Sequence, residues 1–144
     1  MSGIRIEWEG FDEAAWNGLY DQMPRPALQQ HWAYGEAARQ VTGQPPVRGL
    51  IRRNTKPVGL IQGVGGRGFL SLRVIRFLRG PCFLSTVKPT ERAQALRLIK
   101  QAFGLLKGGL AVIMPDLAEE DRSEELMKSA NLHRVLTGHQ TMLL

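Results

Sequence analysis

The chain has 144 residues, 43% of them apolar and 22% charged, with a net charge of +6, which predicts one globular domain over residues 1–144. A single cysteine, Cys82, excludes an internal disulfide, and no apolar stretch approaches the ~20 residues that a membrane helix needs. The amino terminus alternates apolar and charged residues and so does not resemble a signal peptide, and we expect a cytoplasmic protein.

In the first part of the chain, alternation of apolar and charged side chains predicts a strand over residues 4–9. A helix is expected next, with Asp12 as its N-cap and with Phe11 packing on Trp16 one turn later. This helix must end before Pro24, because proline interrupts helical hydrogen bonding.

A second helix is predicted over residues 28–42, ending at Gly43. Two strands, 47–53 and 57–64, follow and are joined by a polar turn. The glycine-rich residues 63–68 are interpreted as a bend between strands.

Residues 69–79 are ambiguous when only periodicity is considered. Arg73, Arg76 and Arg79 lie at helical spacing, with a Gly-Pro pair directly behind them. The β-branched and aromatic residues between the arginines instead favour a strand.

The last part of the chain predicts a helix, a strand, a short helix and a final strand. Thr90 is expected to cap the third helix, which an apolar stripe extends as far as Gly108. The later elements are expected at residues 110–114, 123–131 and 133–144. The order β-α-α-β-β-β-α-β-α-β predicts an α/β or α+β fold with a mixed sheet.

Charge is unevenly distributed along the chain. The acid-free segment, residues 37–90, contains no Asp or Glu and ten Lys or Arg, whereas the other 90 residues hold nine basic and thirteen acidic side chains. Such segregation predicts a positive face that attracts phosphate, nucleotide, RNA or an acidic membrane. The alternative is a basic surface that serves only solubility.

Two segments considered together suggest a family. The first, residues 28–36, carries a Gln-x-x-Trp pattern that ends at Trp32, and the second, residues 77–84, carries Arg79-Gly80-Pro81. With the strand that ends at Pro115 and the closing strand that contains Thr141, they resemble the FemAB-like family of peptidoglycan-bridge aminoacyltransferases and their relatives, in the same order over residues 28–144. The resemblance also favours a strand at residues 69–79.

This resemblance implies a GNAT-like N-acyltransferase fold, with a mostly antiparallel mixed sheet flanked by helices. Family members usually carry two such domains in tandem, and this chain resembles the first, acceptor-binding half. A homodimer or a second domain would then complete the machinery. Bridge-forming members place a Lys four residues after the Trp, where it meets a nucleotide diphosphate. Here that position is Glu36, which would repel a phosphate, so a nucleotide-linked acceptor is not expected.

Other motifs have plain structural interpretations. Residues 63–68 spell G-x-G-x-x-G, but a dinucleotide site would require a helix directly behind them. The acetyl-CoA loop of GNAT enzymes, Gln/Arg-x-x-Gly-x-Gly/Ala, is matched by Gln62 and Gly65 but has Arg67 at its last position. The three histidines lack metal-ligand spacing, so we expect no metal site.

The leading hypothesis is an N-acyltransferase in which an acceptor amine attacks an activated ester or thioester directly. The protein would align the substrates, and backbone N–H groups at a break in the sheet would polarise the carbonyl. The donor would be aminoacyl-tRNA or acyl-CoA, and no catalytic base is assigned. The expected substrate-binding residues are Trp32, Tyr34, Arg67, Arg73, Arg76, Arg79 and Gly80, with core packing as the alternative role of Trp32.

Two further hypotheses stay open. The first is a non-catalytic binding domain that uses the same fold and a basic, anion-binding face. The second is a small nucleotide-binding oxidoreductase that uses the glycine stretch.

Overall fold

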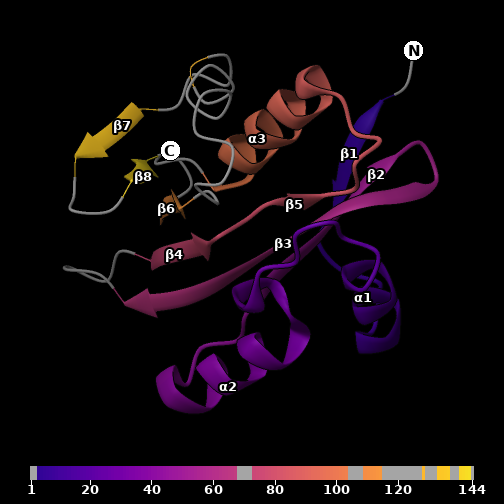
Figure 1. Ribbon diagram of the computed structural model, residues 1–144. Helices are drawn as coiled ribbons and strands as arrows, with labels where there is room; N and C mark the ends of the chain where they lie inside the picture. Colours follow the sequence, from indigo (N-terminus) through magenta and orange to yellow (C-terminus); the bar gives the residue numbers. More distant parts are fainter. Residues whose placement is uncertain are drawn as a thin grey trace.

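The structure is a computed structural model that describes residues 3–67, 73–103, 109–114, 128, 133–136 and 140–143. Within them, a single sheet is flanked by helices on both sides (Figure 1). The elements in chain order are β1 (Ile4–Glu7), α1 (Glu13–Tyr20), the 3₁₀ turn η1 (Leu28–Gln30), α2 (Trp32–Thr42), β2 (Val47–Arg53), β3 (Lys56–Arg67), β4 (Arg73–Leu78), β5 (Cys82–Phe83), α3 (Pro89–Phe103), β6 (Gly109–Met114), β7 (His133–Leu136) and β8 (Gln140–Leu143).

The strands are arranged in the order β1-β2-β3-β4-β6-β8-β7, with β5 paired to β3. All of these pairs are antiparallel except β4 with β6, which is parallel because the chain crosses over through α3 between them. α1 and α2 lie on one face of the sheet and α3 on the other (Figure 1). The predicted mixed, mostly antiparallel sheet with flanking helices is therefore confirmed.

Each face of the sheet has its own core. On the α3 side, Phe77 and Ile113 are buried against Leu96 and Ile99 of the helix. On the α1 side, Trp16 is buried in the cluster that also contains Leu50 and Leu60. Consecutive strand residues therefore serve opposite cores, as the alternating geometry of a strand requires.

The predicted start of the first helix is confirmed in detail. Oδ1 of Asp12 accepts a hydrogen bond from the Ala15 backbone N–H at 2.9 Å, and Phe11 stacks on Trp16 with ring centroids 5.8 Å apart. The second predicted helix is interrupted, because residues 28–30 form η1 and His31 has extended backbone angles before α2 begins. Its predicted end is confirmed, since Gly43 closes α2 with a left-handed φ of 70°.

The predicted glycine-rich bend at residues 63–68 is wrong as far as Arg67, because β3 continues straight through Gly63, Gly65 and Gly66. Close packing explains the first of these glycines. A Cβ on Gly63 would lie 2.6 Å from Cε1 of Phe77, so only glycine lets that ring cross the strand.

The described part of the ambiguous stretch forms the strand β4 from Arg73 to Leu78, while residues 69–72 lie outside the described residues. The predicted cap Thr90 is instead inside α3, which begins one residue earlier at Pro89, a residue suited to the first helical position. The predicted final strand over 133–144 is two strands, β7 and β8, which pair antiparallel with His133 opposite Leu143. The short helix predicted over 123–131 lies outside the described residues except for position 128.

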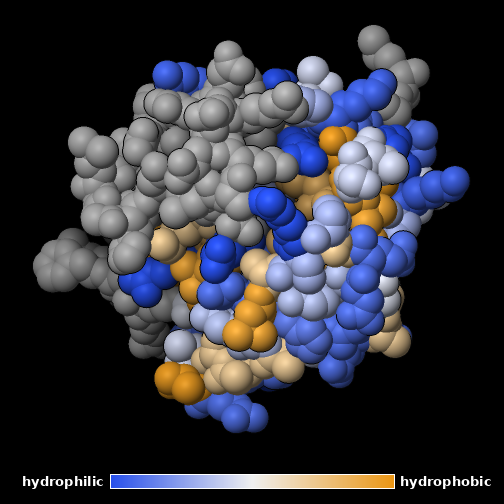
Figure 2. All heavy atoms as spheres, viewed as in Figure 1, coloured by the Kyte–Doolittle hydropathy of each residue, from blue (hydrophilic) through white to orange (hydrophobic). Residues whose placement is uncertain are grey.

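The surface carries both hydrophilic and hydrophobic side chains. In the part of the visible face that is described, hydrophilic residues predominate and apolar ones lie between them in small areas (Figure 2). None of the described helices combines the length and the apolar composition that crossing a membrane requires.

Candidate functional site

The sheet has a break between β3 and β4. β3 pairs with β4 from Val64 onward and with β5 at Gly59 and Leu60, so the residues between these two ladders have no strand partner on that side. The chain leaves β4 through Arg79, which has a φ of 50°. The break therefore lies beside the Arg-Gly-Pro turn.

The side chain of Gln30, which is fully buried, fills this break. Its Nε2 donates to the backbone carbonyl oxygens of Gln62, at 3.0 Å, and Leu78, at 2.7 Å. Its Oε1 accepts from the Gln62 backbone N–H at 2.7 Å. One side-chain amide thus makes the hydrogen bonds that a neighbouring strand would make.

Gly80 lies directly against this amide. A Cβ at position 80 would be 2.6 Å from Nε2 of Gln30, so a larger residue would displace either the turn or the glutamine. The two sequence segments that carry the family resemblance are therefore in physical contact, through Gln30 in the first and Gly80 in the second.

A second buried amide, that of Gln62, continues the network toward α2. Its Nε2 donates to the carbonyl oxygens of Gln29, at 3.1 Å, and His31, at 2.8 Å. Its Oε1 accepts from Nε of Arg48 at 2.7 Å. The stretch between η1 and α2 is thereby fixed to the middle of β3.

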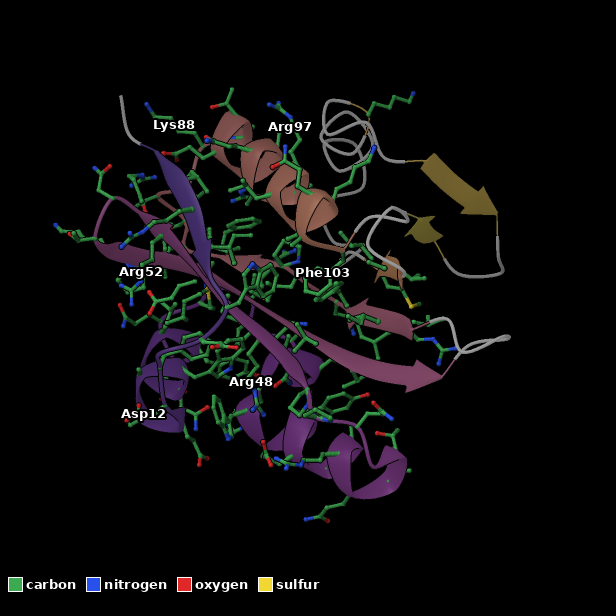
Figure 3. All side chains as sticks on the ribbon, turned by 180° about the vertical axis from the view of Figure 1, so that it is seen from behind. Asp12, Arg48, Arg52, Lys88, Arg97 and Phe103 are labelled. Atoms are coloured by element: carbon green, nitrogen blue, oxygen red, sulfur yellow. The ribbon has the colours of Figure 1, made fainter. Side chains whose placement is uncertain are left out.

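Arg48 lies between the sheet and α2 and makes several contacts at once (Figure 3). Its Nη2 donates to the Trp32 carbonyl oxygen at 2.9 Å and to Oε1 of Glu36 at 3.0 Å. Its Cζ is 3.5 Å from the Trp32 ring centroid, a cation–π geometry. Burial lowers the pKa of Arg48, and the hydrogen bond that Arg48 donates to Glu36 opposes that shift. Glu36, whose side chain is 41% exposed, therefore contacts a cation of the protein itself.

Of the predicted site residues, Trp32 and Gly80 belong to this network. Trp32 is half-buried, and its ring packs edge-on against that of Trp16, with the ring centroids 6.1 Å apart. It borders the α1-side core, a placement that agrees better with the core-packing alternative. Tyr34 is half-buried on α2.

The predicted arginines lie at the end of β3, on β4 and in the turn that follows β4. Arg76 and Arg79 are exposed, while Arg73 is the backbone partner of Arg67 at the end of β4 that is remote from the Arg-Gly-Pro turn. The two ends of a six-residue strand are about 17 Å apart, so the backbones of these four residues do not meet at one point.

Sequence reasoning missed Gln30, Gln62 and Arg48. Gln30 lies inside the Gln-x-x-Trp segment, which was the available signal for it. Gln62 and Arg48 lie on strands where a polar residue usually faces solvent, so no pattern marked them as buried partners. Among the described residues, no group of three His, Cys, Asp or Glu side chains is placed to hold a metal ion.

No family model matches the sequence, and a search of the curated proteins finds no match. Among solved structures, FemX superposes with a TM-score of 0.70 and 15% identity over 89% of this chain, which spans only 32% of the FemX chain. The aminoglycoside acetyltransferase AAC(6')-Ib, solved with coenzyme A, has a TM-score of 0.62 and 13% identity, with 99% of this chain and 94% of that chain covered. The spermidine N-acetyltransferase of Vibrio cholerae, solved with CoA and spermine, has a TM-score of 0.61 and 9% identity, with 98% of this chain and 94% of that chain covered.

At these identities the likeness defines a fold. The chain has the fold of the GNAT-type N-acyltransferases, which is also found in about a third of FemX.

Proposed function

We propose that this chain is an N-acyltransferase domain of the FemAB/GNAT-like type and that it serves as the acceptor-binding half of the reaction. The observation that carries the proposal is the Gln30 amide, which joins the Trp32 segment to the Arg79-Gly80-Pro81 turn at a break in the sheet. The superposition on FemX over most of this chain supports it.

The residues of the break suit acyl transfer. Gly80 lies in the turn beside the Gln30 amide and carries a backbone N–H, whereas Pro81 behind it has none. A donor of this kind, held by a rigid turn, stabilises the negative charge that develops on a carbonyl oxygen under attack. In this scheme Gly80 polarises the acyl carbonyl and the acceptor amine attacks it without a covalent enzyme intermediate. The C–N bond forms, the ester or thioester bond breaks, and the tRNA hydroxyl or CoA thiol leaves with the proton that the amine loses.

The acceptor lies against the α2 side of the break. Trp32 offers a ring whose orientation Arg48 and Trp16 fix, and Glu36 offers an exposed carboxylate beside it. Tyr34 is half-buried on the same helix, and Arg76 on β4 and Arg79 in the turn behind it would supply cations for an anionic or tRNA-linked substrate. The donor is aminoacyl-tRNA or an acyl-CoA, and a second domain or a homodimer would complete the site.

A non-catalytic binding domain is the second candidate. It is favoured by the share of FemX that the chain spans, about a third, since one part of a larger enzyme need not catalyse alone.

Incubation of the protein with radiolabelled aminoacyl-tRNA or acetyl-CoA and with primary amines tests the proposal. Spermidine, kanamycin and a lysine-containing muropeptide are suitable acceptors. We expect transfer to at least one of them, and Trp32→Ala should lower kcat/KM about a hundredfold, because displaced reactants react far more slowly.

Trp8→Ala is the matched control, since Trp8 is also half-buried but packs against Phe103 on the α3 side, 4.9 Å away. Absence of transfer from both donors would favour the binding domain. Equal losses in the two tryptophan variants would show that Trp32 acts only through stability.

A further inference from the structure

The start of α3 offers few free hydrogen-bond donors. The Lys88 N–H donates to Oε2 of Glu91 at 2.9 Å, and the N–H groups of Glu91 and Arg92 both donate to the Lys88 carbonyl oxygen at 3.0 Å. Pro89 has no N–H. From residue 88 to residue 92, only the Thr90 N–H makes no hydrogen bond to the described part of the chain.

The carboxylate at this helix end is firmly held. Nε and Nη2 of Arg53 donate to the two oxygens of Glu91 at 2.7 and 2.6 Å, and Nη2 also donates to the Thr86 carbonyl oxygen at 3.1 Å. Glu91 itself is only 8% exposed. Because Arg53 and the Lys88 N–H stabilise its charge, the pKa of Glu91 falls to about 2. A fixed negative charge therefore occupies the place where a helix attracts anions.

Nucleotide phosphates bind at helix N-termini when the backbone N–H groups there are free and a glycine-rich loop lets the phosphate approach. The connection into α3, residues 84–88, reads Leu-Ser-Thr-Val-Lys and contains no glycine. The glycine-rich residues 63–67 lie within β3 instead of preceding a helix. The other described α-helices also begin behind a side chain of the protein, Asp12 at α1 and His31 at α2.

We propose that Glu91 closes the start of α3 to phosphate groups, so that this domain does not hold the nucleotide phosphates of coenzyme A there. The residues present do not fit that cofactor, although solved structures of the same fold contain it. If the proposed acyl transfer is correct, it follows that the donor to this half is an activated acyl group other than a coenzyme A thioester.

Titration of the ¹⁵N-labelled protein with coenzyme A, and separately with inorganic phosphate, tests the closure. In the wild type we expect no shift of the amide resonances of residues 87–92, which corresponds to a Kd weaker than about 1 mM. In Glu91→Gln, which removes the carboxylate and frees Arg53, we expect these resonances to shift with both anions and the apparent affinity to rise at least about tenfold.

Glu7→Gln is the control. Glu7 also forms an ion pair with an arginine, Arg52, but lies on β1. It loses the same charge and should behave as the wild type. Shifts at residues 87–92 of the wild type with coenzyme A would overturn the proposal. Absence of binding by Glu91→Gln would show that Glu91 is not the closing group.

The donor assays above separate the two proposals. Acyl transfer from acetyl-CoA by the wild type would contradict the inference about the donor while leaving the proposed activity intact. If neither donor supported transfer, the proposed activity would be contradicted, while the titration result would be unaffected.

Discussion

Gln30 and Gln62 show how two single residues organise the candidate site. The Gln30 amide uses both of its N–H donors and its carbonyl oxygen on backbone groups of β3 and β4, so its hydrogen bonding is satisfied although the residue is fully buried. Hydropathy patterns rank glutamine as a surface residue, so they could not place either side chain inside. The partners lie 32 and 48 positions away, and no local signal specifies them.

Replacing Gln30 by leucine should therefore be costly. The variant keeps the volume but leaves the buried Gln62 N–H and the part-buried Leu78 carbonyl without this partner, so we expect the free energy of unfolding to fall by about 1–3 kcal/mol. Urea denaturation measures this. Gln29→Leu is the control, because the Gln29 side chain makes no hydrogen bond to a described residue, and it should stay within about 0.5 kcal/mol of the wild type. Equal effects of the two substitutions would contradict the role assigned to the Gln30 amide.

Among the elements, those with strong local signals were predictable. Asp12 and Phe11 specified the start of α1, Gly43 specified the end of α2, and the β2 boundaries at residues 47–53 were correct. The glycine-rich part of β3 was predicted wrongly, because glycine is permissive in a turn and is also required where a large ring crosses a strand. Only the position of the Phe77 ring in the folded protein distinguishes a glycine of a turn from a glycine of a strand here, and the sequence pattern does not give that position.

This explanation of β3 predicts different behaviour for two of its glycines. Gly63→Ala should lower the free energy of unfolding by about 1–3 kcal/mol, because the new methyl group would overlap the side chains of Phe77 and Ile75. In Gly65→Ala the methyl group would meet only Cβ of Gln44 at 3.6 Å, an ordinary contact, so a much smaller change is expected. Thermal or urea unfolding of both variants checks this, and a larger loss for position 65 would refute it.

Over the whole molecule, folding places acidic side chains from the two flanks against basic side chains of the acid-free segment. The acid-free segment begins directly after Glu36 and ends directly before Glu91, and these two carboxylates bind Arg48 and Arg53 within it. Glu7 similarly binds Arg52. Three of the ten cations that predicted a positive face are thus engaged by acidic residues from outside the segment, a pairing that charge counts along the chain could not reveal.

The stability of the molecule should depend on pH through Glu91. Its pKa is about 2 in the folded protein against an ordinary 4.5, so its contribution is complete above about pH 4.5 and is lost as the pH falls toward 2. Over that range the free energy of unfolding should fall more steeply for the wild type than for Glu91→Gln. Arg53→Gln should remove most of the same difference, because Arg53 is the main cause of the shift. Parallel profiles for the wild type and Glu91→Gln would disprove this, and urea unfolding at a series of pH values measures it.

The break that Gln30 fills also constrains the order in which the protein can fold. The hairpin of β2 and β3 needs only local pairing. The Gln62 N–H, in contrast, has its partner only when Gln30 of η1, 32 residues earlier in the chain, packs against β3. Such a late, non-local closure is slower than hairpin formation. A folding chain would therefore form the β2–β3 hairpin before the Arg-Gly-Pro turn and η1 are joined through Gln30.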